Sequence, residues 1–317
     1  MTTSPPPAAG WPVVSADAAA PRGHLGEWRA VASLPAMAGS LLLLLVAFGW
    51  MGRGEGLVLA GWLSSGAAVC TRSGERIAVR VGFGFRRPSS AQWAALELPW
   101  RSALDRVGIV RDAVDLYVAP GGDVNAYAVG GRSIAVTSGA LNELLAQRLS
   151  SVDIEAVLGH ELGHIATRAT RFGVISTWLA VPWRLTSRAV FGLGLATVGR
   201  REPIRLLGLV VAAAVVRAVV QAICQGQTAA AALLCALSAC VVLCPLADAW
   251  ISRRSEFAAD RLATQHGAGP QLAAALTRLG RRRGGRQSWT QAALNKHPNT
   301  ARRIAAIERL QARSSQP

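Results

Sequence analysis

The chain has 317 residues, of which 51% are apolar, and its formal net charge is +16. This apolar content excludes a largely disordered chain, because disorder goes with low hydrophobicity. Five cysteines in this length exclude a disulfide-rich secreted scaffold. The excess positive charge indicates either a nucleic-acid-binding surface or basic flanks on membrane segments, and the position of the charges decides between them.

The N-terminal part contains the first membrane signal. Residues 1–33 are rich in proline, alanine and glycine, and we expect a disordered tail there. Residues 34–51 carry no charge and are about long enough to cross a bilayer, although a buried helix of a soluble protein is the alternative. Residues 56–70 are either the return limb of a hairpin or an interfacial segment. We therefore predict an N-terminal membrane segment over 34–70, with a hairpin as the favoured form.

Residues 71–171 are predicted to be outside the membrane. Arginines at positions 72–87 place this region in the cytoplasm by the positive-inside rule. The pattern predicts a helix over 91–110, strands at 116–118 and within 126–136, and a helix over 138–148. Ser150 and Asp153 have the spacing of a capping box, and apolar residues at helical spacing follow them. The sequence therefore predicts a further helix over 151–169.

The C-terminal half has three apolar stretches before a second polar region. Residues 172–199 are interrupted by proline and arginine, which favours an interfacial or re-entrant segment. Residues 206–250 form two apolar stretches with an uncharged connection and arginines at both outer flanks. That pattern is typical of a transmembrane hairpin whose ends both lie in the cytoplasm. Residues 251–317 are again polar, with helical signals over 255–265, 270–279 and 300–312.

An H-E-x-x-H motif at residues 160–164 falls on the predicted helix over 151–169. His160 and His164 share one helix face because they are four residues apart, so both imidazoles can reach one ion. A catalytic zinc site keeps a position open for water and lowers the pKa of that water to about 7. Glu161 can accept the proton of the bound water. The alternative is an ordinary helix that carries two histidines.

A catalytic zinc ion needs a third protein ligand. Glu256 is the best candidate, since no histidine follows His164 within the next turns. Asp260 lies one turn after Glu256 on the same face, where it can accept the second N–H of a ligating histidine. An ordinary pair of exposed acids on a helix is the alternative.

Four blocks occur in an order that resembles a known family. They are Asn125–Gly139, Glu155–His164, Glu256–Asp260, and His297-Pro298 followed by Arg303. In these residues the chain resembles the HtpX-like integral-membrane zinc metallopeptidases, HExxH gluzincins related to the CAAX prenyl endopeptidases. The resemblance implies a mainly α multi-pass membrane protein with a small β-sheet. Its zincin-type catalytic domain would be built around the HExxH helix from residues 71–171 and 251–317.

The resemblance also implies roles for individual residues. His160, His164 and Glu256 would hold one Zn²⁺ per chain, with Glu161 as general base and Asp260 behind the ligands. An edge strand would bind the substrate backbone. For Asn125, the alternative is an ordinary role in a turn. His297 and Arg303 would orient the site or stabilise the oxyanion, although Arg303 can instead merely pair with an acid. The implied edge-strand residues are Asn125, Ala126, Tyr127 and Ala128.

These inferences predict a membrane-bound zinc metalloendopeptidase that hydrolyses peptide bonds in misfolded or membrane-associated proteins. We expect it in a bacterial-type inner membrane with the site facing the cytoplasm. Its partners would be protein or peptide substrates and the lipid bilayer. A catalytically silent membrane adaptor on a peptidase fold is the alternative. Nucleic-acid binding is not expected, because much of the charge flanks apolar segments and no reading motif is present.

Overall fold

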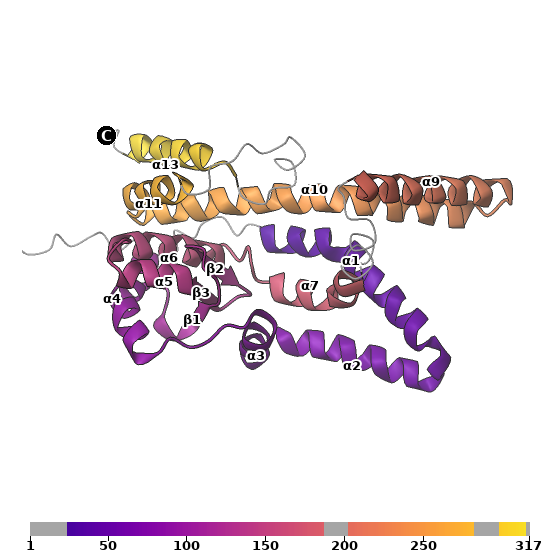
Figure 1. The fold of residues 1–317 in the computed structure, drawn as a ribbon, viewed down its shortest axis with the longest axis horizontal. Coiled ribbons are helices and arrows are strands. Elements are labelled where there is room, and N and C mark those ends of the chain that lie inside the picture. The colour runs from indigo at the N-terminus through magenta and orange to yellow at the C-terminus, as the bar shows by residue number, and fades with distance from the viewer. Residues whose placement is uncertain (1–23, 187–201, 282–297, 315–317) are drawn as a thin grey trace, which may run out of the picture.

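The computed structural model describes residues 24–186, 202–281 and 298–314. A small sheet and several short helices form a dense end, and long helices make up most of the rest of the described molecule (Figure 1). These are α1 (Leu25–Phe48), α2 (Arg53–Val69), α9 (Glu202–Cys224) and α10 (Thr228–Gln265). The fold is mainly helical, as the sequence predicts.

The first helix begins earlier than the sequence indicates. α1 starts at Leu25, so the tail predicted for residues 1–33 is too long, and residues 1–23 lie outside the described part of the chain. The reason is a long-range contact, because Arg29 in the first turns of α1 hydrogen-bonds to Ser252 of α10 at 2.8 Å. Tertiary contacts of this kind override weak local helix signals.

The dense end contains the sheet. Its strands are β1 (Asp115–Ala119), β2 (Ala126–Val129) and β3 (Ser133–Thr137), in the spatial order β1-β3-β2. β3 is fully buried, pairs parallel with β1 and pairs antiparallel with β2. β2 therefore lies at one edge of the sheet, with its second side available to another element.

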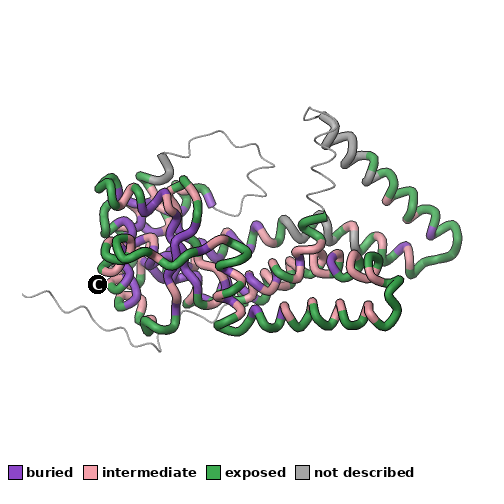
Figure 2. Tube along the Cα trace, turned by 60° about the horizontal axis from the view of Figure 1, so that its bottom comes forward, coloured by how far each residue is buried: buried purple, intermediate pink, exposed green. Residues whose placement is uncertain are grey.

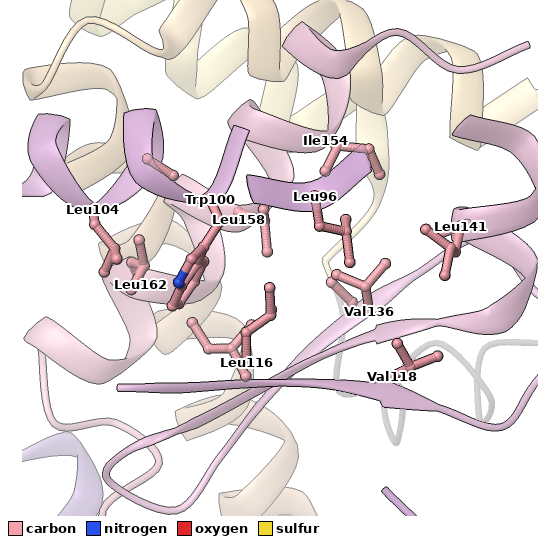
Figure 3. Packing of buried hydrophobic residues seen from close by; sticks show 14 of the residues in the cluster. Leu96, Trp100, Leu104, Leu116, Val118, Val136, Leu141, Ile154, Leu158 and Leu162 are labelled. Atoms are coloured by element: carbon pink, nitrogen blue, oxygen red, sulfur yellow. The ribbon is translucent and has the colours of Figure 1, made fainter. Parts of the chain in front are cut away.

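Helices α4 (Ser90–Val107) and α6 (Ser151–Ala166) cover one face of the sheet. Their apolar side chains interdigitate with those of the strands (Figure 3). Leu96 of α4 and Leu158 and Leu162 of α6 are all fully buried. Other short elements at this end include α3 (Arg72–Phe83) and α5 (Ser138–Leu145).

The start of α6 has the capping box that the sequence predicts. The Ser150 hydroxyl accepts from the Asp153 amide at 3.1 Å, and the Asp153 carboxylate accepts from the Ser150 amide at 3.1 Å. Arg278 of α11 (Gly269–Arg281) also contacts this carboxylate. The cap fixes the helical register of the H-E-x-x-H residues that follow.

Helix α7 (Gly173–Leu179) opens the stretch that was expected to be interfacial or re-entrant. It contacts both α1 and α2. Trp178 donates its indole N–H to the Ser65 hydroxyl of α2 at 3.0 Å, and the Trp183 amide donates to the Ser40 hydroxyl of α1 at 3.1 Å. The described part of this stretch is therefore held between two long helices, whereas residues 187–199 lie outside the described part.

Helix α10 joins two segments that the sequence treats separately. The apolar stretch over 228–250 and the helix predicted over 255–265 form one helix of 38 residues, about 57 Å long. α10 packs against α9 at its apolar end and against α6 and α13 (Thr300–Ser314) at its polar end. A rigid connection thus links the apolar helices to the dense end of the molecule.

Burial differs sharply between the two ends (Figure 2). Buried residues are concentrated in the dense end, whereas large apolar side chains on the long helices are exposed. Within the described residues, the segment Leu25–Met51 is long and apolar enough to cross a membrane, with a mean hydropathy of 2.2 over an 18-residue window. Other exposed apolar residues on the long helices include Leu57, Leu63, Val216, Val220, Ile223, Leu233 and Leu243.

A buried acid on α3 anchors the turn between β2 and β3. The Glu75 carboxylate accepts from the amides of Gly131 and Arg132, both at 3.0 Å, and from the Ser133 hydroxyl at 2.7 Å. Gly130 in this turn has a φ of 67°, and a Cβ there would lie 2.5 Å from the Glu75 carboxylate carbon. The position therefore requires glycine for both conformation and space.

We expect Glu75→Ala to lower the free energy of unfolding by about 2–4 kcal/mol, since it leaves two amides without their acceptor. Unfolding monitored in detergent measures this change. Glu97→Ala is the matched control, because Glu97 is partly exposed on α4 and pairs with Arg101 on its own helix. An equal effect of the two substitutions would contradict the anchoring role.

Candidate active site

Two helices bring three ligand-type side chains together. His160 and His164 lie on α6 and Glu256 lies on α10, and one ligand atom from each falls within 4.8 Å of the others. The Glu256 carboxylate oxygens are 3.4 Å from His160 Nε2 and 3.6 Å from His164 Nε2. All three residues are buried. Two imidazoles and one carboxylate form a donor set that suits a catalytic zinc ion.

A glycine inside the motif allows this approach. A Cβ at Gly163 would lie 3.1 Å from both the Cα and the carbonyl oxygen of Ala259 on α10. A larger side chain would therefore push the helices apart. Small residues at both positions let α6 and α10 pack closely enough for Glu256 to reach the two histidines.

Asp260 and Arg303 lie behind the three ligand-type residues. His160 Nδ1 is 2.9 Å from Asp260 Oδ1. Arg303, on α13, donates from Nε and Nη2 to the two oxygens of Asp260 at 2.8 and 2.7 Å, and its Nη1 lies 2.8 Å from Glu256 Oε2. Glu256 and Asp260 are only 6% and 1% exposed, so they are not an ordinary pair of surface acids.

The charges in this cluster depend on one another. Burial and the nearby Arg303 oppose a charge on His160, but Asp260 and Glu256 outweigh both and raise the pKa of His160 to about 10. Burial alone would raise the pKa of Asp260, yet His160 and Arg303 hold it below its usual value. Metal ions bind neutral imidazole. An ion bound here would therefore take the place of the His160 proton.

The two histidines have different surroundings. His160 has Asp260 at its second ring nitrogen, whereas His164 Nδ1 is buried and has no hydrogen-bond partner among the described residues. A carboxylate behind a ligating histidine fixes the orientation of its ring. Asp260 can therefore orient His160, and this structure shows no equivalent support for His164 from the described residues.

Glu161 faces the edge strand of the sheet. Its carboxylate accepts a hydrogen bond from the Ala128 amide of β2 at 2.7 Å. The antiparallel register directs the amides of Ala126 and Ala128 away from β3, because alternate residues of a strand face its partner. The Ala126 amide donates to the side-chain oxygen of Asn125 at 3.0 Å. The predicted edge-strand residues therefore lie next to Glu161.

A cavity of about 510 Å³ opens between α6, α10 and β2. Its lining contains all four predicted edge-strand residues, together with His160, Glu161, His164, Glu256 and Arg303. The Tyr127 hydroxyl donates to Asp123 at 3.0 Å. His297 lies outside the described part of the chain.

Other lining residues were not found from the sequence. Arg29 lies in the segment predicted as a tail, and Thr170, Ser252 and Ser255 belong to no recognised motif. Of these residues, only Ser252 could have been placed in the cavity from the sequence, because it lies four residues before Glu256 on one helix face.

The fold and the cluster define a helical protein with a buried H-E-x-x-H centre completed by a glutamate. A model of peptidase family M48 matches residues 100–311, and the chain belongs to that family.

Individual relatives match over shorter regions. Protease HtpX of Photorhabdus laumondii is 35% identical over 99 residues, which cover 28% of this chain and 31% of that protein. Protease HtpX of Xylella fastidiosa strain M12 is 29% identical over 189 residues, which cover 57% and 55% of the two chains. The chain thus spans about half or less of the length of these relatives. The crystal structure of S. mikatae Ste24p covers 85% of this chain and 62% of that chain at 18% identity, with a TM-score of 0.49.

Arg303 provides a test of the cluster. We expect Arg303→Lys to weaken the affinity for Zn²⁺ by about 10- to 100-fold, because lysine cannot bridge Asp260 and Glu256 in the same way. Competition with a fluorescent chelator measures this affinity. Arg302→Lys is the matched control, since Arg302 is the exposed neighbour on α13. Equal affinities of the two variants would contradict the bridging role.

Proposed function

We propose that the protein is a membrane-bound zinc metalloendopeptidase with one Zn²⁺ per chain, held by His160, His164 and Glu256. One observation carries this proposal: the three buried side chains converge beside Glu161 at the edge of a sheet. The cavity next to them leaves space for a water molecule and a substrate carbonyl. Membership of peptidase family M48 supports the same activity.

When bound, the zinc ion would polarise the scissile carbonyl and favour ionisation of the attacking water. Glu161 would take the proton of that water and later deliver it to the leaving amine. Asp260 would hold the His160 ring in place. Because Arg303 is already engaged by Asp260 and Glu256, we assign it to orienting the site rather than to the oxyanion.

The edge strand would bind the substrate backbone. An extended peptide can add to β2 through main-chain hydrogen bonds, which tolerate many side chains. Its carbonyl would accept from the Ala128 amide, which in this structure donates to Glu161. Substrate binding would therefore release Glu161 from β2 at the moment when its carboxylate is needed as a base.

The substrates would be misfolded or membrane-associated proteins. The exposed apolar helices support a multi-pass protein, with α1 and α2 as one hairpin and α9 and the first part of α10 as another. Arg254 stacks at 3.9 Å over the Trp250 ring, where α10 passes from apolar to polar residues. Aromatic and basic residues gather at membrane interfaces. We place the protein in a bacterial-type inner membrane, with the site in the cytoplasm.

We expect Glu161→Gln to retain Zn²⁺ and to lose casein cleavage by about 100-fold or more, because the general base is removed. Cleavage is measured with the detergent-purified protein, and metal content by elemental analysis. Glu155→Gln is the matched control: Glu155 lies on the same helix, pairs with Arg106 and does not line the cavity. Full cleavage by Glu161→Gln would exclude this mechanism, and a wild-type protein that binds zinc without cleaving would favour an adaptor.

A further inference from the structure

One end of the cavity is built from polar groups that the proposed chemistry does not use. Arg29 comes from α1, Thr170 follows α6, and Ser252 and Ser255 lie on α10. We call these four residues the Arg29 subsite. Ser252 is one turn before Glu256 on the same helix face, so the subsite lies about 6 Å along α10 from the proposed metal ligand.

The hydrogen bonds within the subsite leave one hydroxyl hydrogen without an acceptor among the described residues. Arg29 donates to the Ala169 carbonyl at 3.3 Å and to the hydroxyls of Ser252 and Ser255 at 2.8 and 3.4 Å. The Ser255 hydroxyl donates to the Ser252 carbonyl at 2.7 Å. The Ser252 oxygen thus accepts from Arg29, and its own hydrogen has no acceptor among the described residues.

Thr170 adds a hydroxyl that has no partner among the described residues. The residue is only 8% exposed, and its buried side-chain oxygen has no hydrogen bond within the described part of the chain. A buried polar group without a partner costs stability unless a water or ligand satisfies it. Because Thr170 lines the cavity, its missing partner can come from a bound molecule.

The nearby carboxylates of Asp248 and Glu256 balance part of the charge of Arg29. Its Nε lies 4.0 Å from Asp248, at the outer limit of an ion pair, and the hydrogen bonds that it donates to described residues go to neutral oxygens. A guanidinium and two hydroxyl donors around one space suit an anionic acceptor. The cavity lining also contains the apolar residues Val157, Leu272 and Leu276.

We propose that the Arg29 subsite binds a carboxylate of the peptide substrate. This inference rests on the proposed function and adds a specificity determinant to it. The subsite lies one helical turn of α10 from Glu256, so the carboxylate would belong to a residue near the scissile bond. This carboxylate is either an aspartate or glutamate side chain or the carboxylate at the end of the substrate chain. An apolar substrate side chain would contact Val157, Leu272 and Leu276.

Binding of labelled peptides to the zinc-loaded full chain with Glu161→Gln tests this inference without hydrolysis. One pair of peptides differs by Glu or Gln at a single position, and a second pair ends in a free or an amidated carboxyl group. We expect the anionic member of one pair to bind about tenfold more tightly, from charge-assisted hydrogen bonds. A preference in the first pair identifies a side chain, and one in the second identifies the chain end.

Three further variants assign the preference to the subsite. Thr170→Val and Ser252→Ala should each reduce the ratio of the two affinities severalfold. Ser176→Ala is the matched control, because it also removes a buried hydroxyl that has no hydrogen-bond partner among the described residues, but one that does not line the cavity. Its ratio should stay at the wild-type value.

The inference is overturned if both members of each pair bind equally, if neither binds, or if Thr170→Val and Ser252→Ala leave the ratio unchanged. Because binding is read without hydrolysis, these results are distinct from the casein assay. A protein that cleaves casein but shows no anionic preference keeps the proposed function and loses the subsite. A protein that shows the preference without cleaving keeps the subsite as a binding site and loses the proposed hydrolysis.

Discussion

The candidate site depends on the close packing of α6 against α10. The contact between Gly163 and Ala259 sets the separation of the two helices, and this separation brings Glu256 within reach of both histidines. Other contacts also fix the position of each helix. The capping box and the sheet stabilise α6, and α13 packs against α10. Among the described residues, side chains far apart in the sequence thus meet in a cluster whose ligand-type members all come from helices.

This packing buries several charges, so the site must balance them. Arg303 lies among the carboxylates of Glu256 and Asp260, and His160 lies beside the same two groups. Buried ion pairs are stable only when their partners are well placed, and loss of one partner leaves an uncompensated charge. A divalent ion would add further positive charge next to Glu256. The carboxylates of this cluster therefore both orient the ligand-type residues and favour a bound cation.

The length of α10 ties the site to the exposed apolar helices. Ser252, Glu256 and Asp260 lie on one face at four-residue spacing, and the apolar part of the same helix ends only a few residues earlier. Arg29 connects α1 to this face. If these helices are embedded as we propose, the cavity opens close to the membrane surface. A protease placed there would meet membrane-associated chains first.

Much of the site could be predicted from the sequence because its signals are local. The capping box and the four-residue spacing of His160 and His164 depend only on neighbours along one helix. Arg29 and Glu75 could not be found in this way, because their roles come from contacts with residues far along the chain. The arginines at 253 and 254 suggested an interruption after the apolar stretch, yet α10 continues through them.

The central claim is that one ion is held by residues from both α6 and α10. Zinc content and X-ray absorption of the purified protein test it most directly, in the wild type and in Glu256→Ala, with His266→Ala as a control outside the cavity. The account predicts one zinc ion per chain with two imidazoles and a carboxylate in the wild type and in His266→Ala, and a large loss of zinc in Glu256→Ala. Zinc bound equally well by Glu256→Ala would contradict it.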